Sequence, residues 1–337
     1  MPSLIIQTSF LGDMVLTTPL IARLAESGPV DVLATPRAGA LLENNPDVRE
    51  VIVYDKRGAD RGVAGFTRMA ARLRAKDYDA AYMAQGSFRS GALVLAAGIR
   101  DRVGFASSAG RMFYTTRVPS VENMHHAARL LSLGTREPMR EVPVPELRPH
   151  LYPGAPERAA VDELLGTASS DDPLIALAPG SVWGTKRWPY YAELARALHD
   201  LARIVVVGAD ADRPLAAEIR DATGGAAIDA TGHLSLLASA ELIDRASLLV
   251  TNDSAPLHLA SAMNTPTIAI FGPTVPEFGF GPLADRSQTV GHAGLACRPC
   301  DRHGPQRCPL GHWRCMREIT AERVAGLARE LLTTRTS

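Results

Sequence analysis

A carboxylate stands just after the first apolar run of the chain. Residues 4–6 are followed by a loop that ends in Gly12 and Asp13. Gly12 permits a tight turn, and Asp13 can cap the next helix by accepting hydrogen bonds from backbone N–H groups. A carboxylate in this place can also take a proton from an incoming hydroxyl, as a general base. Helix cap and general base both stay open for Asp13. The loop lacks the G-x-G-x-x-G pattern of a dinucleotide site.

A second loop, residues 179–189, carries two glycines, hydroxyl side chains and a Lys–Arg pair. Backbone N–H groups, the Ser181 hydroxyl and the cations of Lys186 and Arg187 suit the oxygens of a phosphate or diphosphate. The loop does not have the spacing of a P-loop. The alternative is a solvated loop whose last two residues begin a helix.

A third segment ends a strand and begins a helix at Asp253 and Ser254, with Pro256 in the first turn. Proline costs little there, because the first helical N–H groups have no partner within the helix. The N–H groups of Ser254 and Ala255 would lie at the positive end of the helix dipole, which predicts an anion site. His258 shares a helix face with Ser254. The alternative is a buried helix that Asp253 caps, with a structural histidine.

All four cysteines lie in one short segment, as Cys297, Cys300, Cys308 and Cys315. In a reducing compartment, clustered cysteines bind metal more often than they form disulfides. Four thiolates predict a structural zinc rather than a catalytic one, because they leave no open coordination position. The irregular spacing leaves free thiols as the alternative.

The elements that must position these residues alternate between strands and helices. Apolar runs that precede helical patterns occur at residues 4–6, 30–33, 51–54, 80–83, 174–177, 204–207, 248–251 and 267–271. This alternation predicts an α/β chain of two doubly wound, Rossmann-like domains with parallel sheets. The domains would be 1–150 and 151–318, with a Pro-rich linker within 142–173 and a final helix in 319–337. Ligands would bind in a central cleft that the carboxyl ends of the strands face.

Composition and charge narrow the class of protein. The 337 residues are 46% hydrophobic, with 36 basic and 36 acidic side chains. This is typical of about two globular domains and excludes disordered, collagenous and coiled-coil chains. The charge balance argues against nucleic-acid binding. No secretion signal or membrane span is recognisable, so we expect a cytoplasmic protein. The basic helix at 68–76 is either a solvated face or a contact for anionic lipid.

Together these motifs resemble glycosyltransferase family 9, the ADP-heptose:lipopolysaccharide heptosyltransferases. The resemblance rests on LGD at 11–13 with TTP at 17–19, PGS…KRWP within 179–189, and NDSAPLHLA with NTPTIAIFGPT within 252–274. The cysteine-rich tail is similar to the heptosyltransferase II branch. The chain departs from the family pattern at Ala255, where glycine is usual.

The resemblance implies a GT-B fold and an inverting transfer of L-glycero-D-manno-heptose from ADP-heptose to the lipopolysaccharide inner core. The first domain would bind the lipid A-linked core oligosaccharide and the second the ADP-sugar, and the final helix would return toward the first domain. A lipid-linked acceptor implies peripheral contact with the cytoplasmic face of the inner membrane. No catalytic cofactor is implied.

The matching positions also imply residue roles. Asp13 would deprotonate the acceptor hydroxyl, and Lys186 would stabilise the departing ADP. The substrate-binding set comprises Gly12, Ser181, Arg187, Asp212, Asp253, Ser254, Ala255 and His258. Asp212 would meet the ribose hydroxyls, and Asp253 would hold the donor sugar or order its loop.

Two alternatives involve other chemistry. A related GT-B transferase would use another donor or acceptor. A non-catalytic protein that binds a nucleotide sugar would keep the anion site and would not need Asp13. Transfer from ADP-heptose with and without Asp13 separates the catalytic from the non-catalytic alternative.

Overall fold

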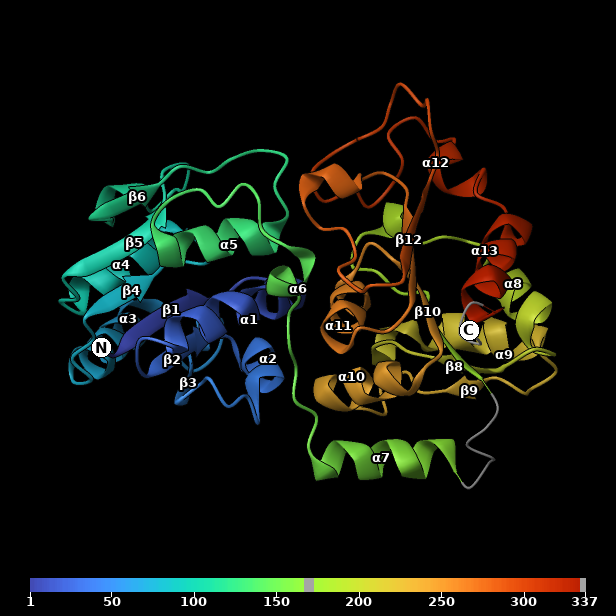
Figure 1. The fold of residues 1–337 in the computed structure, drawn as a ribbon, viewed down its shortest axis with the longest axis horizontal. Helices are drawn as coiled ribbons and strands as arrows, with labels where there is room; N and C mark the ends of the chain where they lie inside the picture. The colour runs from blue at the N-terminus through green and yellow to red at the C-terminus, as the bar shows by residue number, and fades with distance from the viewer. Residues whose placement is uncertain (167–172, 334–337) are drawn as a thin grey trace. The chain divides into compact units, whose positions relative to one another are not determined.

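The computed structural model describes residues 1–166 and 173–333, and residues 167–172 of the predicted linker lie outside these ranges. The chain divides into two compact units, Met1–Tyr152 and Pro153–Ser337. The predicted boundary after residue 150 lies close to this division. Each unit is built on one parallel six-stranded sheet with helices packed against it (Figure 1).

The first unit has the strand order β3-β2-β1-β4-β5-β6. Its elements are β1 (Ser3–Gln7), α1 (Leu11–Ala25), β2 (Val30–Ala34), α2 (Pro36–Gly39), η1 (Ala40–Leu42), β3 (Glu50–Val53), α3 (Gly62–Arg74), β4 (Ala80–Tyr82), α4 (Phe88–Ala96), β5 (Asp101–Phe105), η2 (Arg111–Phe113), β6 (Thr116–Val118), α5 (His126–Thr135) and α6 (Val144–Leu147). Strands β1 and β2 are buried along their whole length, as expected for central parallel strands covered on both faces.

The second unit has the order β12-β11-β10-β7-β8-β9. Its elements are α7 (Ala155–Leu165), β7 (Leu174–Ala178), η3 (Gly184–Lys186), α8 (Tyr191–Leu198), β8 (Arg203–Val206), η4 (Asp210–Asp212), α9 (Arg213–Ala222), β9 (Ile228–Asp229), α10 (Leu236–Arg245), β10 (Leu248–Asn252), α11 (Ala255–Met263), β11 (Thr267–Phe271), η5 (Pro276–Phe278), β12 (Ser287–Gly291), α12 (Arg314–Arg317) and α13 (Ala321–Thr333).

The strand order places the candidate loops. In the first sheet the order reverses between β1 and β4, and in the second between β7 and β10. Loops after strands on either side of such a reversal diverge and leave room for a ligand. The loop with Asp13 follows β1. The loop 179–189 follows β7, and Asp253 follows β10, whose Thr251 pairs with Ala178 of β7.

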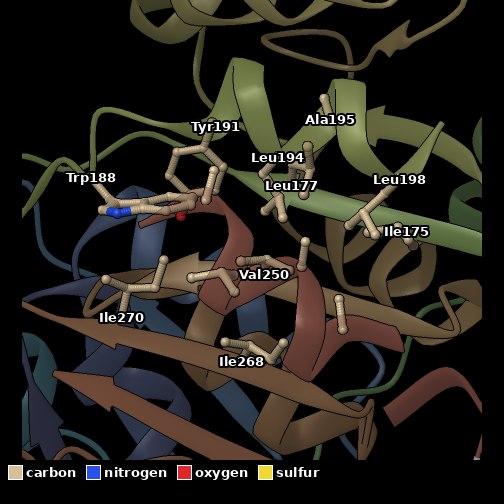
Figure 2. Packing of buried hydrophobic residues seen from close by; sticks show 14 of the residues in the cluster. Ile175, Leu177, Trp188, Tyr191, Leu194, Ala195, Leu198, Val250, Ile268 and Ile270 are labelled. Carbon is tan, nitrogen blue, oxygen red and sulfur yellow. The ribbon is translucent and has the colours of Figure 1, made fainter. Parts of the chain in front are cut away.

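One cluster of buried apolar side chains forms the core of the second unit. Side chains of β7, β10 and β11 pack against α8, with Ile175, Val250 and Ile268 from the sheet and Leu194 and Leu198 from the helix (Figure 2). The helix presents these apolar residues on one face because they recur at helical spacing.

The final helix α13 packs within the second unit. It contacts α8, β10 and β11, and its Val324, Ala325 and Ala328 are buried in the same apolar cluster (Figure 1). That the helix returns toward the first domain stays a prediction, and its apolar face packs within the second unit. An amphipathic helix has one such face, and here α8 and the second sheet cover it.

Every helix in the described ranges is too short or too polar to cross a lipid bilayer.

A buried carboxylate lies near the amino ends of the strands in the first sheet and bonds to side chains from two other segments. Asp31 of β2 is 0% exposed. It accepts two hydrogen bonds of 2.8 Å from Arg49 and another from the Tyr78 hydroxyl. Burial acts to raise the pKa of Asp31, but the hydrogen bonds from Arg49 and Tyr78 together with the charges of Arg49 and Lys76 outweigh it, so this pKa is lowered. The ion pair lies at the edge opposite Asp13.

We expect Asp31→Ala to lower the free energy of unfolding by about 1–3 kcal/mol, because it removes the acceptor of the buried Tyr78 hydroxyl while Arg49 stays partly exposed. A carboxyl with a lowered folded pKa stabilises the fold above its unfolded pKa, and this contribution is lost as pH falls through the folded pKa. Urea titrations should show a constant difference from wild type between pH 5 and 8 that shrinks below the ordinary pKa of 3.8. An equal difference at pH 3 and pH 7 would contradict the assignment.

Candidate functional site

Asp13 lies in the first turn of α1. The helix begins at Leu11, so Phe10 is the N-cap and Asp13 is the third helical residue. Its Oδ2 accepts from the Ser9 hydroxyl at 2.6 Å and from the Phe10 N–H at 3.3 Å. Nε2 of His126 lies 3.6 Å from Oδ1, and the Asp13 side chain keeps 17% exposure. The N-cap interpretation of Asp13 is wrong, because the carboxylate reaches back to the N-cap from within the helix.

Gly12 lies inside α1 as its second residue, so the tight turn expected there does not form at this glycine. No motif in the sequence points to His126, which begins α5, or to Lys56, which follows β3. Lys56 Nζ donates to the Thr8 hydroxyl at 3.1 Å. Burial, followed by the charges of Arg57 and Arg89, lowers the pKa of Lys56. Packing of α5 beside α1 brings His126 to Asp13, and pairing of β3 with β2 and β1 brings Lys56 to the same loop, so no local spacing in the sequence could reveal either side chain.

In the second unit, Lys186 and Asp253 form a buried ion pair. Lys186 Nζ lies 2.6 Å from Asp253 Oδ2, and the two side chains are only 9% and 10% exposed. The Thr274 hydroxyl donates to the same oxygen at 2.7 Å. Lys186 comes from η3, Asp253 follows β10, and Thr274 follows β11. Three of the motif segments thus converge on one carboxylate oxygen.

Asn252 explains why two of these segments meet. This last residue of β10 is fully buried, and its Nδ2 donates to Pro179 O at 2.8 Å. Its Oδ1 accepts from the Trp188 N–H at 3.2 Å and from the Tyr191 hydroxyl at 3.3 Å. One amide side chain therefore fastens both ends of the loop 179–189. Trp188 is buried and packs against Tyr191, so this end of the loop is not solvated.

Asp212 lies against the same loop. A Cβ on Gly180 would stand 2.4 Å from the Asp212 carboxyl group, so only glycine admits this approach. Asp212 Oδ2 accepts from the Ala209 N–H at 2.9 Å. Ser181 and Arg187 shape the loop itself, because Arg187 Nε donates to Ser181 O at 2.9 Å. The structure brings Asp212 next to the loop that the sequence predicted for phosphate.

Helix α11 begins beside Asp253. Ser254 occupies the N-cap position, but its side chain makes no capping hydrogen bond to the helix. The N–H groups of Ser254 and Ala255 stand at the end of the helix where the dipole is positive. Pro256 has no N–H, and the Leu257 N–H donates to Ser254 O at 3.1 Å. His258 is 5% exposed and meets the Phe280 ring edge-on at 6.2 Å between centroids. Its surroundings are those of a buried helix face.

The predicted zinc site is not confirmed. In residues 1–166 and 173–333, no group of three or more His, Cys, Asp or Glu side chains is arranged to hold a metal ion. Cys315 is buried, and burial raises its pKa to about 11, with a smaller contribution from the charges of the other cysteines. Cys297 Sγ lies 3.9 Å from His312 Nε2. The four thiols therefore lie in one region without forming a recognisable coordination shell.

The predicted basic helix of residues 68–76 falls at the end of α3, and three of its four cations pair with carboxylates, whereas Arg74 donates to Ala96 O. Arg68 lies 2.8 Å from Asp60, and Arg72 lies 2.9 Å from Glu50, which also binds Lys76. These pairs match the solvated-face alternative.

Comparison with known proteins agrees with this arrangement. The family model described as glycosyltransferase family 9 (heptosyltransferase) matches residues 66–311. Lipopolysaccharide heptosyltransferase 2 of Escherichia coli K12 is 30% identical, covering 86% of this chain and 88% of that protein. Lipooligosaccharide heptosyltransferase 2 of Haemophilus influenzae is 28% identical, covering 98% and 99%. The solved structure of E. coli ADP-heptose LPS heptosyltransferase II matches with a TM-score of 0.83 and 26% identity over 100% of both chains. The two parallel sheets are those of the GT-B fold, and this chain belongs to glycosyltransferase family 9.

Proposed function

We propose that this protein transfers L-glycero-D-manno-heptose from ADP-heptose to the lipopolysaccharide inner core, with inversion at the anomeric carbon, in the manner of a heptosyltransferase II. The observation that carries the proposal is the convergence of Lys186, Asp253 and Thr274 beside the amino end of α11. A cation and helix N–H groups in a largely buried place suit the diphosphate of a nucleotide sugar.

The second unit would bind the donor and stabilise the leaving group. As the bond between the anomeric carbon and the ADP oxygen breaks, the electron pair stays on ADP. Lys186, the Ser181 hydroxyl and the N–H groups of Ser254 and Ala255 would stabilise this charge, and burial strengthens each interaction. Asp253 would hold Lys186 in place and accept from a donor-sugar hydroxyl. Asp212, beside Gly180, would accept from the ribose hydroxyls.

The first unit would bind the acceptor and supply the base. Asp13 would take the proton of the acceptor hydroxyl while that oxygen attacks the anomeric carbon. Ser9 and His126, which contact the two carboxylate oxygens, would orient it. The transition state would have oxocarbenium character, by analogy with glycoside hydrolysis. Every step in this mechanism uses side chains of this chain and its two substrates.

The partners follow from the reaction. The acceptor would be a lipid A-linked core oligosaccharide, which requires peripheral contact with the cytoplasmic face of the inner membrane. Because Arg68, Arg72 and Lys76 are paired with carboxylates, the basic stretch of residues 68–76 is not proposed as the membrane contact. The cysteines receive no role in the chemistry, because the described residues form no set of ligands that fits a zinc ion.

Mass spectrometry of acceptor lipids tests the proposal. Incubation with ADP-heptose should add one heptose to a core acceptor that already carries one heptose, whereas other sugar nucleotides should add nothing. Addition of a different sugar, or of heptose to another acceptor, would favour the related GT-B transferase. Tight ADP-heptose binding without any product would favour a non-catalytic binding protein.

A further inference from the structure

The segment that carries the first cysteines also holds the loop of Lys186. The N–H of Thr185 donates to Pro305 O at 3.2 Å, and the Thr185 hydroxyl donates to the same oxygen. The N–H of Gly184 donates to Gln306 Oε1 at 3.1 Å, and Gln306 Nε2 donates to Val182 O at 2.9 Å. The loop is therefore bonded on both sides of Gly184 by two consecutive residues of the cysteine segment.

Two glycines permit this close approach. A Cβ on Gly184 would lie 2.4 Å from Gln306 O, closer than real atoms come. Gly304 has a φ of +82°, and its Cβ would stand 3.0 Å from Pro273 and 3.1 Å from the Thr185 hydroxyl. A side chain at either position would push the cysteine segment away from the loop.

The same segment holds the turn that carries Thr274. Arg298 Nε donates to Gly272 O at 2.6 Å, and its Nη2 donates to Phe271 O and Thr274 O at 3.0 Å each. Its Nη1 donates to His292 O at 2.9 Å. A guanidinium presents its N–H groups in a rigid fork, so one side chain can fix four carbonyl groups at once.

These two sets of contacts meet at Asp253. Its Oδ2 is bonded by Lys186 from one held loop and by Thr274 from the other. Outside strands and helices, a loop keeps one conformation only if other contacts offset its conformational entropy. A functional group must also be held by supporting contacts to stay in productive geometry. Residues 298–306 supply such contacts to both loops.

We propose that residues 298–306, which we call the clasp, set the geometry of the donor diphosphate site, with Arg298 and Gln306 as positioning residues. This inference rests on the proposed role of Lys186 in binding the ADP moiety. It assigns to the cysteine-rich tail a task in substrate binding that requires no metal.

Calorimetry with ADP and steady-state kinetics test the clasp on the whole protein. Gln306→Ala should raise the dissociation constant for ADP and the KM for the donor about five- to tenfold, with the KM for the acceptor within twofold of wild type. Arg298→Lys keeps the charge but loses most of the carbonyl contacts, and it should act in the same direction. Gln288→Ala, the same substitution near the amino end of β12, should change neither constant. A merely structural role would lower the melting temperature without this split between donor and acceptor.

The clasp is refuted if folded Gln306→Ala and Arg298→Lys both bind ADP within twofold of wild type while Lys186→Ala binds it much more weakly. If Lys186→Ala itself binds ADP normally, the donor site is misassigned and the proposed function fails first. Should Arg298→Lys not fold, Gln306→Ala decides alone, because its side chain is exposed and its loss leaves no buried charge.

Discussion

Replacing Asp13 by asparagine should lower kcat about 10²- to 10⁴-fold, the range that general acid–base catalysis contributes. Asparagine has nearly the same shape and still offers an oxygen to the Ser9 hydroxyl and the Phe10 N–H. The first turn of α1 should therefore persist, and the loss should fall on kcat rather than on binding. Transfer of heptose, followed by mass spectrometry of the acceptor, measures the effect.

A matched control separates the loss of the proposed base from the general effect of replacing an aspartate by asparagine. Asp79→Asn makes the same substitution at an exposed position next to the amino end of β4, at the opposite edge of the sheet, and should leave kcat unchanged. ADP binding to Asp13→Asn should also be unchanged, because Asp13 belongs to the first unit. Turnover by Asp13→Asn within tenfold of wild type would remove Asp13 as the base.

Lys186→Ala should weaken ADP binding or slow transfer by about 2–3 kcal/mol, the scale of losing one charged donor to a developing anion. It should also destabilise the fold, because Asp253 is left as a buried carboxylate without its partner. Calorimetry with ADP measures the first effect, and urea unfolding measures the second.

A double variant separates the two effects of Lys186. Adding Asp253→Asn to Lys186→Ala removes the unpaired charge, so the free energy of unfolding should recover while the affinity for ADP should not. Arg196→Ala, which removes an exposed cation from α8 of the same unit, serves as the control and should alter neither quantity. Native ADP affinity together with native turnover in Lys186→Ala would contradict its role.

Local sequence patterns predict some of the residues of the candidate site but not all of them. The positions of Asp13, Lys186 and Asp253 follow from loops that come after apolar strands, and the structure places each at a carboxyl end of its sheet. The N-cap role predicted for Asp13 is wrong, because the N-cap is Phe10 and the helix begins three residues earlier than an Asp13 cap requires. His126 could not be found, since only the packing of α5 beside α1 brings it to Asp13.

For the fold too, some elements could be predicted from local sequence patterns and others could not. The helix predicted to begin at Asp253 and Ser254 matches α11, which begins at Ala255 with Pro256 in its first turn. Four strands are absent from the sequence prediction. β6, β9 and β12 lie at sheet edges, where β6 and β9 are only three and two residues long and β12 is largely polar, and the internal strand β5 begins with two charged residues. Edge strands lack the continuous apolar pattern that identifies central parallel strands.

By itself the sequence determined the alternation of strands and helices and the two-domain α/β architecture. It also determined the resemblance of the loop motifs to those of one glycosyltransferase family. These features are written in periodicities and spacings within short stretches of chain. Only the tertiary structure decided that Lys186 is paired with Asp253 and that α13 covers the second sheet. It also decided that Arg298 and Gln306 donate hydrogen bonds to loops that are distant in the sequence. The physical reason is that such contacts join loops without periodicity, and their partners are set by strand order and packing rather than by neighbouring residues.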